Sequence, residues 1–332
     1  MGPLRLSTKI ERWPLKSPFR ITGYTWEELP VLVVTLEQEG RTGCGEAAGV
    51  YYKADTPEIM VGQLLTHRLT IERGLTHDDI RRILPPGGAR NALDCALWDL
   101  EAKVTGHPVW ELAALKEKPR PLITTFTCGA DTPEKMAAAA RAYPHAKAIK
   151  VKLTGEPQDA DRVRAIREAR PEVWLGVDGN QGFTRDALER LFPILIESRV
   201  ELLEQPFPIG KEALLDDLDS PIPVAADESV QSLDDIAPLV GRVKVINIKL
   251  DKCGGLTEGL AMAKLAGKLG LDCMVGNMMG TSLAMAPAFL VGQFCQVVDL
   301  DGPIFLKSDR HVQVRYSDGH IDCPPGVWGS PT

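Results

Sequence analysis

Residues 148–152 read AIKVK, the first of five short apolar runs that each end in a charged residue. The other four are WLGVD (174–178), VELLE (200–204), IPVAAD (222–227) and VKVINIK (243–249). The runs end at Lys152, Asp178, Glu204, Asp227 and Lys249, with gaps of 26, 26, 23 and 22 residues. A strand, a helix and two loops need about this much chain in a (β/α)₈ barrel, whose eight units fill roughly 250 residues. The spacing therefore predicts an α/β fold that contains a barrel of parallel strands.

The rest of the second half of the chain fits this alternation. Amphipathic segments with helical spacing fall before, between and after the runs, at 132–144, 157–171, 184–197, 234–240 and 256–270. The charged, proline-bearing segment KEKPRPLI (116–123) predicts a boundary near residue 118. We expect the barrel domain to span residues 118–310.

The first 117 residues show a different order, with strands before helices. Two β-rich segments, 4–15 and 30–40, are joined by a polar and aromatic connection over 17–30. Helical patterns follow at 56–65, with Thr56 as the N-cap, and at 87–106, with Gly106 as the C-terminal glycine. This order predicts an α+β domain over residues 1–117. The tail, about 311–332, has strand-like alternation and is expected to return to that domain.

Composition excludes several classes of protein. The net charge of −7 and the pI near 5.5 give no basic field for nucleic acid. No apolar run approaches the roughly 18 residues of a membrane span, and the N-terminus lacks the apolar core of a signal peptide. Seven cysteines without a CxxC motif indicate a reducing compartment. We expect a cytoplasmic enzyme with a small-molecule partner, and the sequence leaves a homo-oligomer open.

The charged ends of the runs predict a shared site, because catalytic groups of such barrels lie at the C-terminal ends of the strands. Taken singly, each acid is as readily a helix cap or a surface residue. Taken together, Asp178, Glu204 and Asp227 would repel one another unless a divalent cation lay between them. Oxygen ligands of this kind suit Mg²⁺, with Mn²⁺ as the alternative. Lys150 shares a strand face with Lys152, whereas Lys252 is expected to face away from the site.

The combination Lys150-x-Lys152, Asp178, Glu204, Asp227 and Lys249 resembles the enolase superfamily, in its muconate-lactonizing-enzyme subgroup. Two further segments carry the resemblance: ARNALDCALWDLEAKVTGHPVWEL (89–112) and NIKLDKCGGLTEGL (247–260). The resemblance implies a (β/α)₇β TIM-like barrel with an α+β capping domain.

The resemblance also implies a role for each residue. The three carboxylates would hold Mg²⁺, which binds the substrate carboxylate. Lys152 and Lys249 would act on opposite faces of the α-carbon. Lys150 would lower the pKa of Lys152 and touch the carboxylate. Enolase-type sites use a Lys or His base with Mg²⁺ in this way.

A second pair of acids distinguishes among the reactions of the subgroup. Asp299 and Asp301, in VVDLDGP (297–303), stand two residues apart and share a face. In dipeptide epimerases a matching DxD binds the free α-ammonium of the substrate. The resemblance therefore implies a dipeptide epimerase of the L-Ala-D/L-Glu type that serves murein peptide metabolism. Thr281 and Ser282, in MVGNMMGTSLA (274–284), would lie near the substrate's backbone and terminal carboxylate.

Three alternatives remain at this point. An N-acylamino acid racemase and an o-succinylbenzoate synthase use the same scaffold. A metal-dependent binding protein without turnover is the alternative of another class, although binding alone requires no base on each face.

The segment FRITGYTWEE (19–28) is expected to set side-chain specificity. Some acidic-dipeptide epimerases carry an arginine here, and Gly23 stands at its place in this chain. Arg20 would substitute only if the loop bends differently, while Tyr24 and Trp26 offer aromatic surface. We expect Glu27 and Glu28 to face solvent. The segment thus predicts a broader specificity than strict Ala-Glu.

Overall fold

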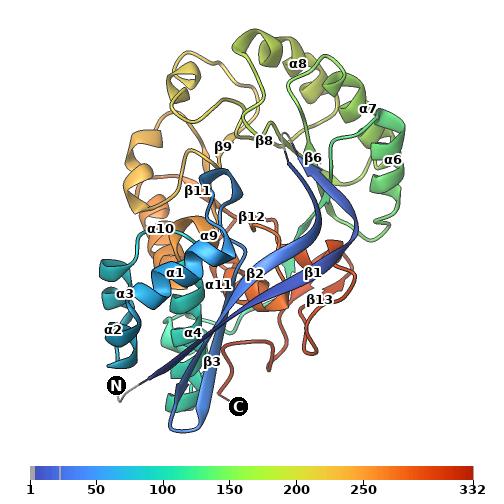
Figure 1. Ribbon diagram of the computed structural model, residues 1–332. Coiled ribbons are helices and arrows are strands. Elements are labelled where there is room, and N and C mark those ends of the chain that lie inside the picture. The colour runs from blue at the N-terminus through green and yellow to red at the C-terminus, as the bar shows by residue number, and fades with distance from the viewer. Residues whose placement is uncertain (1–3, 22–23, 332) are drawn as a thin grey trace.

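The computed structural model describes residues 4–21 and 24–331, and the side chains of residues 19–24 lie outside the described part. An antiparallel sheet opens the chain, with strands β1 (Arg5–Ile21), β2 (Tyr24–Gln38) and β3 (Arg41–Ala47). The connection expected over 17–30 is instead mostly strand, because the β1–β2 ladder resumes at Phe19–Trp26 after a register shift. The resulting arm reaches from the first domain across to the barrel (Figure 1).

Short helices complete the capping domain. They are η1 (Tyr51–Lys53), α1 (Pro57–Thr66), α2 (Arg68–Glu72), α3 (His77–Ile83), α4 (Gly88–Thr105) and α5 (Val109–Leu112). Thr56 caps α1 by accepting from the backbone N–H of Ile59, and Gly106 closes α4 in the left-handed conformation. Both ends agree with the sequence prediction. The apolar face of α4 packs against β2 and β3, with Leu93, Leu97 and Leu100 fully buried.

Eight parallel strands form the barrel. Ladder order follows chain order through β5 (Thr125–Cys128), β6 (Ala148–Lys152), β7 (Trp174–Asp178), β8 (Leu202–Glu204), β9 (Val224–Ala226), β10 (Val245–Ile248), β11 (Asp272–Val275) and β12 (Val297–Val298). The ladder does not join β5 to β12 among the described residues. Three side-chain contacts bridge these two ends: Thr125 donates to Asp299, Asp301 accepts from the N–H of Thr127, and Thr124 accepts from the N–H of Leu300.

Helices surround the strands. They are α6 (Pro133–Arg141), α7 (Asp159–Ala169), α8 (Arg185–Glu197), α9 (Leu250–Cys253), α10 (Leu256–Lys268) and α11 (Ser282–Gly292), with 3₁₀ turns η2 (Glu212–Leu215), η3 (Leu233–Asp235), η4 (Ala237–Leu239) and η5 (Gly302–Phe305). The prediction of a helix over 234–240 is wrong, since the 3₁₀ turns η3 and η4 lie there instead. Pro238 in η4 cannot donate the backbone hydrogen bond that an α-helix would need.

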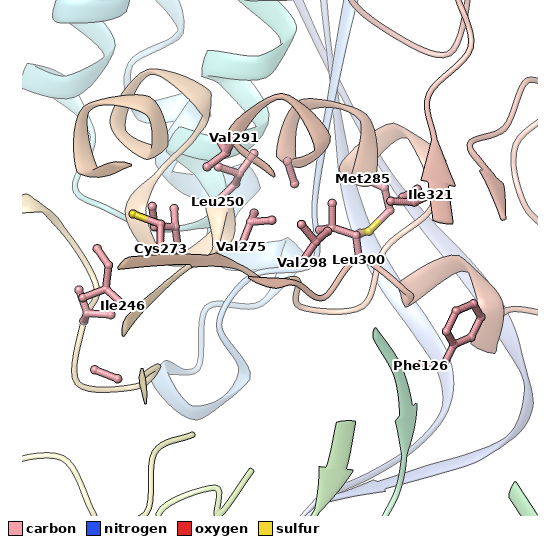
Figure 2. Packing of buried hydrophobic residues seen from close by; sticks show 14 of the residues in the cluster. Phe126, Ile246, Leu250, Cys273, Val275, Met285, Val291, Val298, Leu300 and Ile321 are labelled. Carbon is pink, nitrogen blue, oxygen red and sulfur yellow. The ribbon is translucent and has the colours of Figure 1, made fainter. Parts of the chain in front are cut away.

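Strand alternation separates an outer core from an inner layer. Outward residues such as Val275 and Val298 pack beneath Met285 and Val291 of α11 (Figure 2). Inward residues at the strand starts form a small apolar layer of Leu202, Ala225, Val245 and Met274. Above this layer, the inward positions at the strand ends carry the charged residues of the predicted site.

The cap and the barrel meet along α4. Gly254 and Gly255 form the tight turn after α9 with φ of +87° and +114°, and a Cβ on Gly254 would strike the guanidinium of Arg90. His77 and Trp98, whose rings stack with centroids 4.3 Å apart, also reach this junction. The indole N–H of Trp98 donates to Thr257 of α10 over 2.9 Å.

The C-terminal tail contacts both parts. Strand β14 (His320–Asp322) pairs with β13 (Arg315–Ser317) on one side and with β4 (Leu122–Ile123), beside the barrel, on the other. Beyond them, the indole of Trp328 donates to the carbonyl of Cys44 in β3 over 2.9 Å. The residue numbers that divide the two domains, 1–117 and 118–310, stay predictions. No helix in the described part of the chain combines the length and apolar character that a membrane span requires.

Candidate active site

The strand ends bring the predicted charges to one mouth of the barrel. Neighbouring strands place Lys152 opposite Asp178, and Asp178 opposite Glu204, in their ladder registers. Strand β10 ends one residue before Lys249. Because β6 and β10 stand four places apart in an eight-stranded ladder, Lys152 and Lys249 lie on opposite sides of the barrel.

The ammonium of Lys150 lies among three carboxylates. Its Nζ is 2.7 Å from Glu204, 3.0 Å from Asp299 and 3.1 Å from Asp178, and its side chain is only 4% exposed. Burial would lower the pKa of Lys150, but the carboxylates, Asp299 first, raise it well above its usual range. Lys150 is therefore a fixed cation in this arrangement.

Lys152 forms the second contact with Asp178, at 2.6 Å. Burial would raise the pKa of Asp178, but the two lysines lower it to about 2. The carboxylate thus stays ionised at neutral pH. Glu204 differs, since burial and the neighbouring Asp178 raise its pKa to about 7.

The donor set of Asp178, Glu204 and Asp227 fits a hard divalent cation. All three are buried oxygen donors at the ends of consecutive strands, where burial and the charge of Asp178 raise the pKa of Glu204. Among the described residues no three such side chains already stand as a ligand set, because lysine ammonium groups lie against them instead. The chemistry of the donors supports a metal site, and the lysines supply the counter-charge in this arrangement.

Asp227 is held by two lysines. Lys249 binds Oδ2 at 2.7 Å, and Lys252 binds Oδ1 at 2.6 Å. The expectation that Lys252 faces away from the site is therefore wrong. Lys252 starts in the turn of α9, outside the strand, so the two-residue alternation that guided the prediction does not apply to it. Although burial acts in the opposite direction, these ammonium groups hold the pKa of Asp227 well below its usual range.

Two further polar residues belong to the site. Asn247 donates to Glu204 over 2.8 Å from the strand face that also carries Lys249, so the two-residue rule could have identified it. Glu228 lines the cavity, is 3% exposed, and its Oε2 has no hydrogen-bond partner among the described residues. Burial and the charge of Asp227 raise the pKa of Glu228 to about 7. The sequence held no comparable signal for Glu228, because it lies beyond the end of β9.

Asp299 and Asp301 lie together at the end of β12 and both line the cavity. Asp299 binds Lys150 and the hydroxyl of Thr125, at 3.0 and 2.6 Å. Asp301 accepts from the backbone N–H of Thr127 over 2.7 Å. Burial and the charge of Asp299 raise the pKa of Asp301 to about 7. A buried acid pair of this kind attracts a cationic group of a ligand.

Thr281 and Ser282 are not among the described residues that line the cavity, and their place near the substrate's terminal carboxylate stays a prediction. Both are fully buried; Thr281 donates to Glu46, and Ser282 donates to Asp309 over 2.5 Å. Their hydroxyls thus connect the barrel to β3 and to the C-terminal segment. The preceding residues Asn277, Met278 and Met279 line the cavity in their place.

The cavity has a volume of about 290 Å³ and an aromatic side. Trp26 and Tyr51 line it with ring centroids 5.3 Å apart, and Tyr52 follows Tyr51 at 5.1 Å. Arg12 of β1 also lines it and pairs with Glu28 at 2.6 Å. Glu27 and Glu28 are exposed, as expected.

The side chains of Arg20 and Tyr24 lie outside the described part of the structure. Their contact with substrate therefore stays a prediction.

Similar proteins agree with this geometry. An L-Ala-D/L-Glu epimerase of Escherichia coli (strain K12) is 37% identical over 94% of this chain and 97% of its own length. An N-acetyl-D-glutamate racemase of Pseudoalteromonas sp is 42% identical over 86% of this chain and 91% of its own.

Two solved structures share the fold closely. One, from Agrobacterium tumefaciens, is an enolase family member with homology to dipeptide epimerases and contains sodium and L-Ala-L-Glu; its TM-score is 0.95 at 38% identity, over 98% of this chain and 100% of that one. The other, a dipeptide epimerase of Methylococcus capsulatus with Mg and L-Arg-D-Lys, has a TM-score of 0.91 at 31% identity, over 99% of each chain.

Two family models match the chain over most of its length. The N-terminal domain of the mandelate racemase/muconate lactonizing enzyme family matches residues 5–113, and the enolase C-terminal domain-like family matches residues 134–327. With its barrel, its cap and its strand-end charges, the chain belongs to the mandelate racemase/muconate lactonizing enzyme family of the enolase superfamily.

Proposed function

We infer that the chain is an isomerase, a dipeptide epimerase that inverts the α-carbon of the C-terminal residue and so interconverts L,L and L,D dipeptides. The observation that carries this inference is the placement of Lys152 and Lys249 on opposite sides of one cavity that also contains the acid pair Asp299 and Asp301. Two opposed amines suit proton transfer at one carbon, and the acid pair suits a free ammonium group.

Each side chain has a defined task in this reaction. One lysine, as the neutral amine, takes the α-proton from one face, and the other, as the ammonium, delivers a proton to the opposite face. Lys150 offers a fixed positive charge near the substrate's carboxylate. The acid pair binds the ammonium of the N-terminal residue by charge-assisted hydrogen bonds.

We propose Mg²⁺ as the cofactor, with Mn²⁺ as the alternative, held by Asp178, Glu204 and Asp227. When bound, the ion supplies positive charge that stabilises the carboxylate oxygens of the substrate as the proton leaves. Oxygen-only ligands favour such hard cations. The similar structures that contain Mg or sodium support this choice.

A second candidate is an N-acylamino acid racemase. The 42% identity to an N-acetyl-D-glutamate racemase favours it. The acid pair opposes it, because an acylated amino group carries no positive charge. Substrates with a free amino group therefore fit the cavity better.

Deuterium uptake tests the proposal. The enzyme is incubated with Mg²⁺ and a set of dipeptides in D₂O, and uptake at the α-carbon is followed by mass. The parent should exchange and epimerise free dipeptides. Lys152→Ala and Lys249→Ala should each lose epimerisation and exchange the α-proton of one stereoisomer only.

Lys147→Ala is the matched control, because Lys147 is a surface lysine paired with Asp318. It should keep the parent activity. Epimerisation by Lys249→Ala at the parent rate would exclude the two-base mechanism.

A place in murein peptide metabolism, a cytoplasmic location and a homo-oligomeric state are further proposals. The first follows from the chemistry of Ala-Glu dipeptides and the second from the seven unpaired cysteines.

A further inference from the structure

A second cavity lies beside the active-site cavity. Its volume is about 370 Å³, and it lies between the β1 arm, helix α6 and the turn η5, with Lys16, Pro18, Met136, Ala139 and Tyr143 among its lining residues. Thr127 and Phe305 line both cavities. The two spaces therefore share a wall.

This shared wall stands at the acid pair. The backbone N–H of Thr127 donates to Asp301, and Phe305 ends the turn η5 that begins directly after Asp301. If the proposed function is correct, the ammonium of the substrate lies against Asp299 and Asp301. The side chain of the N-terminal residue is bonded to the same α-carbon as that ammonium, so its first atom lies at the shared wall.

The sizes of the two cavities indicate a division of the substrate. The first cavity, at about 290 Å³, is at the lower end of the roughly 300–1,000 Å³ of ligand pockets, and it must hold the reacting residue and the dipeptide backbone. A large N-terminal side chain requires additional space. The second cavity supplies it within reach of the ammonium site.

The lining selects the kind of side chain. Pro18, Met136 and Ala139 offer apolar surface. The two lysines there are exposed, with Lys16 donating to the carbonyl of Ile304 over 2.8 Å and Lys135 paired with Asp131 at 3.0 Å. Asp131, which lines the same cavity, offsets Lys135, so the positive charge of Lys16 remains at the edge and disfavours a cationic side chain.

We propose that this second cavity is a subsite for the N-terminal residue of the substrate, which takes uncharged side chains larger than that of Ala, with Thr127 and Phe305 at the boundary with the active-site cavity. The proposal rests on the proposed dipeptide epimerase function. The enzyme then recognises both residues of its dipeptide by shape.

Filling the cavity tests the proposal. Ala139→Phe adds a ring to the second cavity, whereas Ala138→Phe places the same ring on the exposed face of α6, outside both cavities. Epimerisation of Ala-Ala and Leu-Ala is compared for both variants. Ala139→Phe should lower kcat/KM for Leu-Ala by at least about tenfold, a loss typical of a crowded apolar pocket, and leave Ala-Ala unchanged. Ala138→Phe should change neither value.

Each other outcome overturns the proposal. An equal loss for both dipeptides would indicate general damage to the active site, and no loss would show that the N-terminal side chain lies elsewhere. Circular dichroism checks folding, and Ala130→Leu, which fills the same cavity from the loop before α6, replaces Ala139→Phe if that variant does not fold. If the parent takes up deuterium into other free dipeptides but not into Leu-Ala, the subsite fails while the proposed function stands; if it takes up deuterium into no dipeptide of the set, the proposed function itself fails, and this subsite fails with it.

Discussion

The ammonium of Lys252 lies 2.6 Å from Oδ1 of Asp227 and binds that oxygen while Lys249 binds the other. Lys252 also donates to the backbone carbonyls of Asp227 and Asn247, and its side chain is 1% exposed. A lysine so enclosed, with all of its donors used, holds its partner in place. It fixes both the orientation of Asp227 and the end of β9 from which Asp227 extends.

Lys252→Met should therefore destabilise the fold. The change leaves Lys249 as the remaining lysine on Asp227 and takes the Lys252 donor from two buried backbone carbonyls, so we expect a loss on the order of 3 kcal/mol in the free energy of unfolding, measured in urea. Lys244→Met is the control, since Lys244 is 54% exposed and pairs with Asp272 at the surface. That change should cost less than about 1 kcal/mol. Equal losses of unfolding free energy in the two variants would show that the ion pair of Lys252 contributes no more to stability than a surface ion pair.

Glu204→Gln should weaken the binding of Mg²⁺. The amide keeps the volume of the side chain and its contact with Asn247 but removes one negative charge from the donor set. We expect most of the activity to be lost and the affinity for Mg²⁺, measured by calorimetry, to fall while circular dichroism is unchanged. Glu201→Gln is the control, since Glu201 is an exposed glutamate directly before the start of the same strand. Full activity of the parent in excess chelator would exclude a metal requirement.

Asp301→Asn should raise KM for free dipeptides. A hydrogen bond to a charged group contributes about 1.5–3 kcal/mol, so we expect roughly a ten- to hundredfold increase. N-acetylated dipeptides and N-acetylglutamate should be poor substrates of the parent. A parent enzyme that prefers N-acylated substrates would replace the epimerase function with the racemase function.

The side-chain specificity should be broader than strict Ala-Glu. The resemblance implies that Gly23 takes the place of the arginine that some acidic-dipeptide epimerases carry, and Trp26 and Tyr51 form an aromatic side of the cavity. We expect kcat/KM for Ala-Phe and Ala-Leu to lie within about 100-fold of that for Ala-Glu, or roughly 2.7 kcal/mol. A larger advantage for Ala-Glu would mean that an arginine reaches the substrate. Arg12→Gln and Arg20→Gln then show which arginine it is.

His77 should make the stability of the cap junction depend on pH. Burial lowers its pKa, but the hydrogen bonds to Asp94 and Glu101, at 2.7 and 3.2 Å, raise it to about 9. A folded pKa above the unfolded value near 6.5 gives stability that is complete below pH 6.5 and is lost as the pH rises through 9. The difference in unfolding free energy between the parent and His77→Gln should fall by on the order of 3 kcal/mol over that range. A difference that is constant with pH would show that His77 folds uncharged.

The charged residues at the strand ends could be predicted from the sequence. In a short apolar strand that ends in a charged residue, the two-residue alternation of side chains shows which positions share the inward face with that residue. Lys150, Asp178, Glu204 and Asp299 follow from that alternation. Lys252 and Glu228 do not, because each lies two or more residues past the end of its strand, where the direction of a side chain depends on the turn.

Contacts between distant parts of the chain also explain two other features that the sequence did not reveal, the partners of Thr281 and Ser282 and the strands of the β1–β2 arm. Thr281 and Ser282 stand at the start of α11, and their hydroxyls bind partners 235 and 27 residues away in the chain. No local pattern reports such contacts. The sequence predicts residues 17–30 of the β1–β2 arm as a connection, because the polar residues there show no strand alternation. The strand conformation follows from the pairing of β1 with β2, which a single segment does not reveal.

The open ends of the barrel ladder at β5 and β12 constrain how this enzyme can diverge. Asp299 and Asp301 bind Thr125 and Thr127 across that gap, so the acids suited to the substrate's ammonium also join the first barrel strand to the last. A lineage that exchanged them for residues suited to an acylated substrate would loosen its own barrel. We therefore expect relatives that lack the acid pair to have changed at position 125 as well, because the Thr125 hydroxyl donates to Asp299, a covariation that an alignment of the family can reveal.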